Sequence, residues 1–244
     1  MIKLGYEIID SVTQGLKPGD LFLIRGNTAC MADRFLRNII ANVCKNKKVA
    51  YFSNGTSKTK IKYDVYRIAG VCNFDFYDID TRHIEKCSEN VADADLVIVD
   101  DIERYCFDWD IEKLYIKLKE IAKETGKPFI AVKGRLTRII FDIELDDPKE
   151  MIDEVDYSLA LEKTQDTGRC LKTDVIMKDN KSKYEKQGKM MSFTPDIMVE
   201  YSKEQELIID NALGMGLDPK DAYYMAQYWK GKEEQIGYIE KEEI

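Results

Sequence analysis

The sequence predicts an α/β fold with a mostly parallel sheet, because short apolar runs alternate with longer segments of helical periodicity. The runs that carry this prediction are residues 21–24, 49–53, 96–100 and 129–132. Each is short enough to be a buried strand, and helices of about ten to fifteen residues fit between them. Strands and helices that alternate in this way form right-handed crossovers and a sheet covered by helices.

The first strand and helix are the best defined. A Pro18-Gly19-Asp20 turn leads into the apolar run 21–24, which is how a buried strand starts. A turn-rich stretch follows, and from Asp33 to Val43 the apolar residues fall at helical spacing. Strand, loop and helix therefore follow one another in that order.

The remaining elements of the core follow from the same patterns. Helices are expected over residues 61–71 and 111–122, the second ended by Gly126-Lys127-Pro128. Further strands are expected near 157–161, 173–177 and 189–193, as antiparallel additions at the sheet edge.

Residues 202–244 differ in kind from residues 1–201, so we predict a core domain and an acidic helical appendage. Ser202 can cap one helix that Gly214 ends, and Asp218-Pro219 can start a second, which predicts a helical hairpin. The appendage has ten acidic and five basic residues in a chain of net charge −8. Its apolar face either packs on the core or docks a partner.

Composition excludes several classes of protein. A chain of 244 residues with 44% hydrophobic residues supports one sizeable core. The sequence has neither a long apolar run nor a secretory signal, so we expect a cytoplasmic protein with no membrane partner. The six cysteines form no C-x-x-C pair and His83 is the only histidine, so we expect no metal site and a surface role for His83.

The frame of a phosphate-binding loop is present, but its contact residues are not. The full motif is G-x-x-x-x-G-K-[ST], in which backbone N–H groups and the positive end of a helix hold phosphates. Gly26 supplies the first glycine, whereas Met31, Ala32 and Asp33 occupy the last three positions. Met31 blocks close backbone approach, Ala32 has no ammonium group, and the Asp33 carboxylate repels phosphate.

A longer stretch of sequence resembles the ATPase domain of DnaB-type replicative DNA helicases, which have the RecA-like P-loop NTPase fold. The resemblance covers roughly residues 4–200 and is most specific in the first forty. It rests on residues 5–10, 13–21, Phe35, Asn38 and Ile39, then on residues 51–53, 126–132 and 154–157 and the strand ending in Asp100.

The resemblance implies roles for several positions, most of which have changed. The glutamate that activates water in the family corresponds to Gly55, and the polar sensor to Gly134. The family's Lys-x-Arg motif corresponds to Lys178-Asp179-Asn180, so the arginine finger is lost unless Lys181 takes its place. The aspartate that helps to hold magnesium is kept as Asp100. The family uses ATP and magnesium, but these losses predict no cofactor here.

A basic stretch is the candidate for contact with nucleic acid. Lys178, Lys181, Lys183 and Lys186 lie within nine residues, near Tyr184. They either contact phosphates of single-stranded DNA, weakly, or are a solvated hairpin loop.

Two functions remain. In the first, the chain is a catalytically degenerate helicase core that does not hydrolyse ATP. It would act as an interaction or DNA-binding protein, with a replicative helicase or another replication protein as partner, and would not form a hexamer alone. In the second, it is an ATP-dependent DNA helicase or ATPase with an atypical nucleotide site, in which Arg25 or Arg34 replaces the missing lysine.

Overall fold

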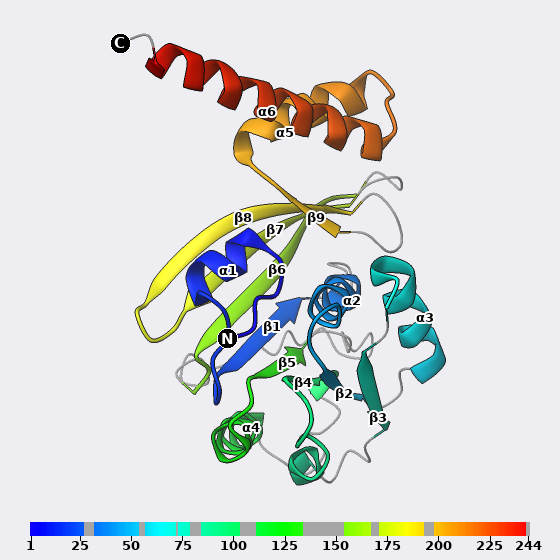
Figure 1. Ribbon diagram of the computed structural model, residues 1–244, viewed down its shortest axis with the longest axis vertical. Helices are drawn as coiled ribbons and strands as arrows, with labels where there is room; N and C mark the ends of the chain where they lie inside the picture. Colours follow the sequence, from blue (N-terminus) through cyan, green and yellow to red (C-terminus); the bar gives the residue numbers. More distant parts are fainter. Residues whose placement is uncertain are drawn as a thin grey trace, which may run out of the picture.

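The chain folds around one mixed sheet with helices on both faces (Figure 1). The computed structural model describes residues 1–26, 32–53, 57–71, 73–78, 84–102, 111–133, 154–166, 171–192 and 198–242. In these ranges the strand order is β3-β2-β4-β5-β1-β6-β7-β8-β9. The strands are β1 (Leu21–Gly26), β2 (Val49–Ser53), β3 (Phe74–Asp78), β4 (Leu96–Val99), β5 (Phe129–Lys133), β6 (Tyr157–Asp166), β7 (Leu171–Asp179), β8 (Tyr184–Ser192) and β9 (Met198–Tyr201).

Six neighbouring strands, from β3 to β6, pair in parallel, and β7, β8 and β9 add to them in antiparallel pairs. This confirms the predicted α/β fold with a mostly parallel sheet. One expectation was wrong: β6 is not an antiparallel addition, because it pairs in parallel with β1, with Phe22 opposite Tyr157. Only the strands after β6 can reverse, since the short turn at residues 180–183 joins β7 directly to β8.

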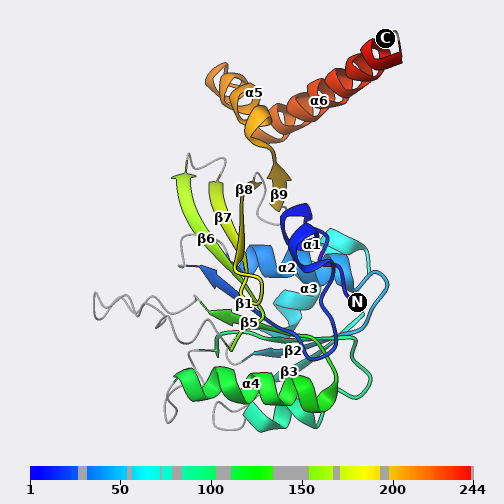
Figure 2. The same ribbon diagram turned by 90° about the vertical axis from the view of Figure 1, so that its left-hand side faces the viewer.

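The sheet is buried on both faces. On one face lie α1 (Glu7–Thr13), α2 (Ala32–Val43) and α3 (Lys58–Ala69); on the other lie α4 (Ile111–Thr125) and the short 3-10 helix η2 (Ile84–Ser88), as Figure 2 shows. Side chains of β1 alternate between the two cores, with Phe22 and Ile24 in the first and Leu21 and Leu23 in the second. Burial on both faces explains why these strands are continuous apolar runs.

The helical hairpin at the C-terminal end is confirmed as α5 (Lys203–Gly214) and α6 (Pro219–Glu242), which lie beyond the end of β9 (Figure 1). Ser202 begins α5 with a capping box that includes Gln205. Ile209 and Ala226 of the hairpin pack with Met191 and Tyr201 of the sheet. At least part of its apolar face therefore contacts the core.

Two ion pairs also join α5 to the sheet. Lys172 on β7 contacts Asp210, and the Lys189 ammonium on β8 lies 3.0 Å from Glu206. The Lys172 side chain is only 6% exposed, so this contact matters for its charge. No helix within the described ranges is long and apolar enough to cross a bilayer.

Candidate phosphate-loop site

The candidate site lies where β1 turns into α2, at the carboxyl ends of the parallel strands. Gly26 ends β1 and Ala32 begins α2. Met31 belongs to the stretch 27–31, outside the described residues. Ligands of open parallel sheets bind at this edge, so the frame predicted from the sequence is in the expected place.

Asp33 places a negative charge in the first turn of α2. Its carboxylate forms an ion pair with Arg37, one turn further along the helix. A second carboxylate, Asp64 on α3, lies 3.0 Å from the same guanidinium group. Arg37 is thus shared between two acids and is 13% exposed, which restrains Asp33 near the positive end of α2.

Ala32 cannot contribute to ligand binding, because its side chain turns inward. It is 5% exposed and belongs to the core between α2 and the sheet. The position that carries an ammonium group in a complete phosphate-binding loop therefore contributes an apolar packing contact.

Asp100 follows the last residue of β4, and its side chain is completely buried. The carboxylate accepts hydrogen bonds from the hydroxyl group of Tyr51 on β2 and, at 3.0 Å, from the backbone N–H of Asp101. Asp101 itself is 2% exposed and has a left-handed backbone conformation, with φ of 56°. The strand-end carboxylates thus lie within the protein interior.

Arg34, a substitute cation in the second hypothesis, is directed toward the other end of the sheet. Its guanidinium group donates a hydrogen bond to the hydroxyl of Ser192, the last residue of β8. Arg25 is half-buried near the end of β1. The positions implied for the general base, Gly55, and for the sensor, Gly134, lie outside the described residues, as does His83.

The candidate DNA-binding lysines gather at the β7–β8 turn, at the opposite edge of the sheet. Lys178 lies 3.3 Å from Glu185, and the Lys186 ammonium donates a hydrogen bond of 2.8 Å to Ser11. Lys181 contacts two buried carboxylates, Asp156 at 2.7 Å and Asp20 at 3.2 Å. Burial alone would lower the pKa of Lys181, but these carboxylates outweigh it and raise this pKa.

Lys183 occupies the turn itself, where its φ is 56°. The structure therefore brings the four lysines together, but three of them contact other groups of the protein. Lys181 in particular ties the turn to residues that precede β1 and β6.

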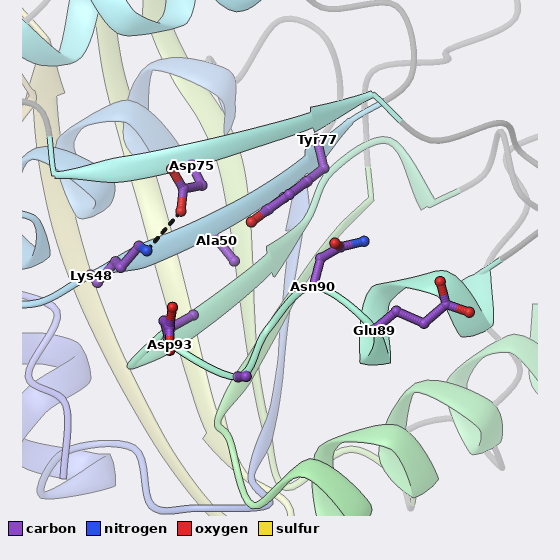
Figure 3. Close-up of a pocket in the computed structure, with 9 residues that line it drawn as sticks. Lys48, Ala50, Asp75, Tyr77, Glu89, Asn90 and Asp93 are labelled. Atoms are coloured by element: carbon purple, nitrogen blue, oxygen red, sulfur yellow. Dashed lines mark ion pairs between the residues drawn. The ribbon is translucent and has the colours of Figure 1, made fainter.

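A separate pocket of about 250 Å³ lies at the amino ends of β2 and β3 (Figure 3). Its lining includes Lys48, Asp75, Tyr77, Asn90 and Asp93. The Lys48 ammonium and the Asp75 carboxylate lie 2.9 Å apart, and this hydrogen bond raises the pKa of Lys48. The pocket is remote from the phosphate loop, because the two sites occupy opposite edges of the sheet.

Sequence reasoning missed Tyr51 and Arg37, which determine the environment of the two site carboxylates. A tyrosine inside an otherwise apolar strand, Val49–Ser53, is a signal that its hydroxyl needs a buried partner. Arg37 follows Asp33 at the spacing of a helical ion pair, which was visible in the sequence. No cluster of three or more potential metal ligands occurs among the described residues.

Comparison with solved structures supports a RecA-like fold. The crystal structure of the RadB recombinase superposes with a TM-score of 0.58 at 17% identity, over 78% of this chain and 95% of that one. The solved ATPase domain of a DnaB-like helicase gives 0.60 at 13% identity, over 78% and 87%.

A KaiC-like protein, PH0186, from the hyperthermophilic archaeon Pyrococcus horikoshii OT3 gives a TM-score of 0.58 at 14% identity, over 82% of this chain and all of that one. No protein-family model matches the sequence, and no curated protein matches it significantly. At these identities the likeness concerns the fold.

Proposed function

We propose that this chain is a RecA-like domain, related to DnaB-type helicases, that neither binds ATP tightly nor hydrolyses it. It works by binding another macromolecule in DNA replication. The observation that carries the proposal is the Asp33 carboxylate in the first turn of α2, restrained by Arg37. A negative charge there interacts favourably with the helix dipole and repels an incoming phosphate.

The surroundings of Asp100 support the same proposal. An aspartate that helps to hold hydrated magnesium needs access to solvent, whereas Asp100 is fully buried and accepts a hydrogen bond from Tyr51. Ala32 offers no charge for the terminal phosphates. These residues fit ATP with magnesium poorly, so no catalytic step is assigned to them.

The test is calorimetry of the full chain with ATP and magnesium. We expect no heat of binding at nucleotide concentrations up to about 1 mM, which corresponds to a binding free energy weaker than about −4 kcal/mol. The alternative, an ATPase with an atypical site, predicts micromolar binding or steady release of phosphate. Either result would overturn the proposal.

A restored loop tests whether these positions form the frame of a phosphate-binding loop. Met31→Gly, Ala32→Lys and Asp33→Thr together should create measurable ATP binding, because they return the phosphate contacts. Turnover should remain absent, because Gly55 is unchanged. A matched control is Asp93→Asn, which removes one negative charge at the other edge of the sheet. If the triple variant folds but gains no binding, the stretch is not a phosphate-binding frame.

A further inference from the structure

The outer face of α3 combines basic and aromatic side chains and takes no part in the phosphate-loop site. The helix has four basic residues and one acidic residue, Asp64, which is buried and turned toward Arg37. Tyr63 and Tyr66 are 60% and 58% exposed. We call the exposed residues Lys58, Lys60, Tyr63, Tyr66 and Arg67 the α3 face; Figure 1 shows α3 at the margin of the fold, beside α2.

From this arrangement we propose that the α3 face binds single-stranded nucleic acid, with the basic groups on phosphates and the tyrosine rings on bases. Such binding sites combine positive charge with aromatic rings on which bases stack. Residues 60, 63 and 67 follow one another at helical spacing, so they form one row along the helix. The Arg67 guanidinium carbon lies 5.6 Å from the centre of the Tyr63 ring, which keeps charge and ring together.

The lysines of the α3 face have no structural role that would explain them. Lys58 and Lys60 form no ion pair in the described structure. They lie in the first turn of α3, where positive charge is unfavourable because it faces the positive end of the helix dipole. By contrast, Lys178, Lys181 and Lys186 near the β7–β8 turn contact Glu185, two buried carboxylates and Ser11.

Positive charge continues beyond the end of α3. The turn after α2 carries the exposed Lys45, and the neighbouring Cys44 sulfur lies 3.9 Å from the carbonyl oxygen of Val71, just past α3. The nearby acid Asp75 contacts Lys48. A polyanion along α3 would therefore meet several cations, although the whole chain has a net charge of −8.

The experiment is a fluorescence anisotropy titration of the full chain with labelled oligothymidine at several salt concentrations. Lys58→Ala with Lys60→Ala should weaken binding at least about tenfold and reduce the salt slope by about 1.4, or about 0.7 for each phosphate that is no longer neutralised. Tyr63→Ala with Tyr66→Ala should weaken binding at least about fivefold. On an abasic probe of equal length, the tyrosine variant should bind like the wild type.

Two comparisons separate this surface from general charge. Lys113→Ala with Lys123→Ala removes two exposed lysines from α4, on the opposite face, and should leave binding unchanged. Lys178→Ala with Lys183→Ala tests the turn predicted from the sequence and should also leave it unchanged. If either variant loses as much affinity as the α3 variants, or if the wild type does not bind at low salt, the proposal is wrong.

Charge reversal excludes unfolding as the cause of any weakened binding. Lys58→Glu with Lys60→Glu should abolish binding while the thermal midpoint stays equal or rises, because acidic residues suit the first turn of a helix. Binding of an acidic polypeptide, with no binding of oligothymidine, would assign the face to a protein partner and overturn the proposal. The result is independent of the proposed loss of ATP binding, which uses other residues.

Discussion

The hydroxyl group of Tyr51, in the middle of β2, donates a hydrogen bond to the carboxylate of Asp100, just beyond the end of β4. Both side chains are fully buried. Parallel pairing sets Tyr51 opposite Ile98, two residues before Asp100 on the same side of the strand. The side chain of a strand-end aspartate is thus held by its neighbouring strand.

Removing this donor should destabilise the protein. Tyr51→Phe leaves Asp100 without the hydroxyl while preserving the ring, so we expect a loss of about 1 to 3 kcal/mol in the free energy of unfolding. Urea denaturation measures it. The matched control is Tyr184→Phe, at a side chain that is 54% exposed, for which the change should be below about 0.5 kcal/mol. Equal stability of both variants would contradict the importance of the pair.

A second prediction concerns acid. Burial alone would raise the pKa of Asp156, but hydrogen bonds from Lys119, Lys181 and the backbone N–H of Leu21 outweigh it and hold this pKa below its usual value. A carboxyl whose pKa is lowered on folding contributes stability above its unfolded pKa of about 4. This contribution is lost as the pH falls from there through the lower, folded pKa.

Asp156→Asn should therefore lower stability at neutral pH and flatten the decline of stability with acid. Urea denaturation from about pH 6 to pH 3 gives the slope, which must be compared with that of the wild type. Asp93→Asn, at an exposed carboxylate, is the control and should keep the wild-type slope. An unchanged slope for Asp156→Asn would show that its charge is not coupled to folding.

Much of the fold could be predicted because the inner strands are buried on both faces. The run Val49–Ser53 was predicted at its observed bounds. The edge strand β3 was missed, since Asp75 and Asp78 interrupt its apolar residues and leave no continuous run. Helix α1 was missed because it spans only seven residues and its N-cap has no side-chain hydrogen bond. Part of its support comes from the distant Glu200, which accepts a hydrogen bond from the Ile8 N–H.

Within the candidate site, the sequence placed residues but not their partners. Asp33 and Asp100 lie at the predicted helix start and strand end. The contact of Asp100 with Tyr51 depends on strand pairing, and that of Arg37 with Asp64 depends on packing of α2 against α3. Neither spacing along the chain nor residue type fixes such contacts between distant segments.

The attachment of the C-terminal hairpin gives a third prediction. Asp210→Ala removes the partner of Lys172, whose side chain is nearly buried, so the free energy of unfolding should fall by about 1 to 3 kcal/mol. Glu204→Ala, at an exposed residue of the same helix, should change it by less than about 0.5 kcal/mol. Faster hydrogen exchange in α5 should accompany the first change. Unaltered exchange would mean that this ion pair does not hold the hairpin.

The last prediction tests how closely α1 approaches β8. A Cβ atom added at Gly188 would lie 2.4 Å from Cδ1 of Ile8, which is fully buried. Gly188→Ala should therefore cost about 1 to 3 kcal/mol of stability through overpacking. Ile8→Val removes the clashing methyl group and alone should cost about 0.5 to 1.5 kcal/mol.

Combining the two changes isolates the contact. If the clash with Cδ1 causes the destabilisation, Gly188→Ala should be much less costly in the Ile8→Val background, giving an interaction energy of at least about 0.5 kcal/mol in a double-mutant cycle. Urea denaturation of the four proteins measures this energy. Gly214→Ala is the control, since an added Cβ there meets no atom within 4 Å. Strict additivity of the two changes would show that α1 does not pack against β8 at Gly188.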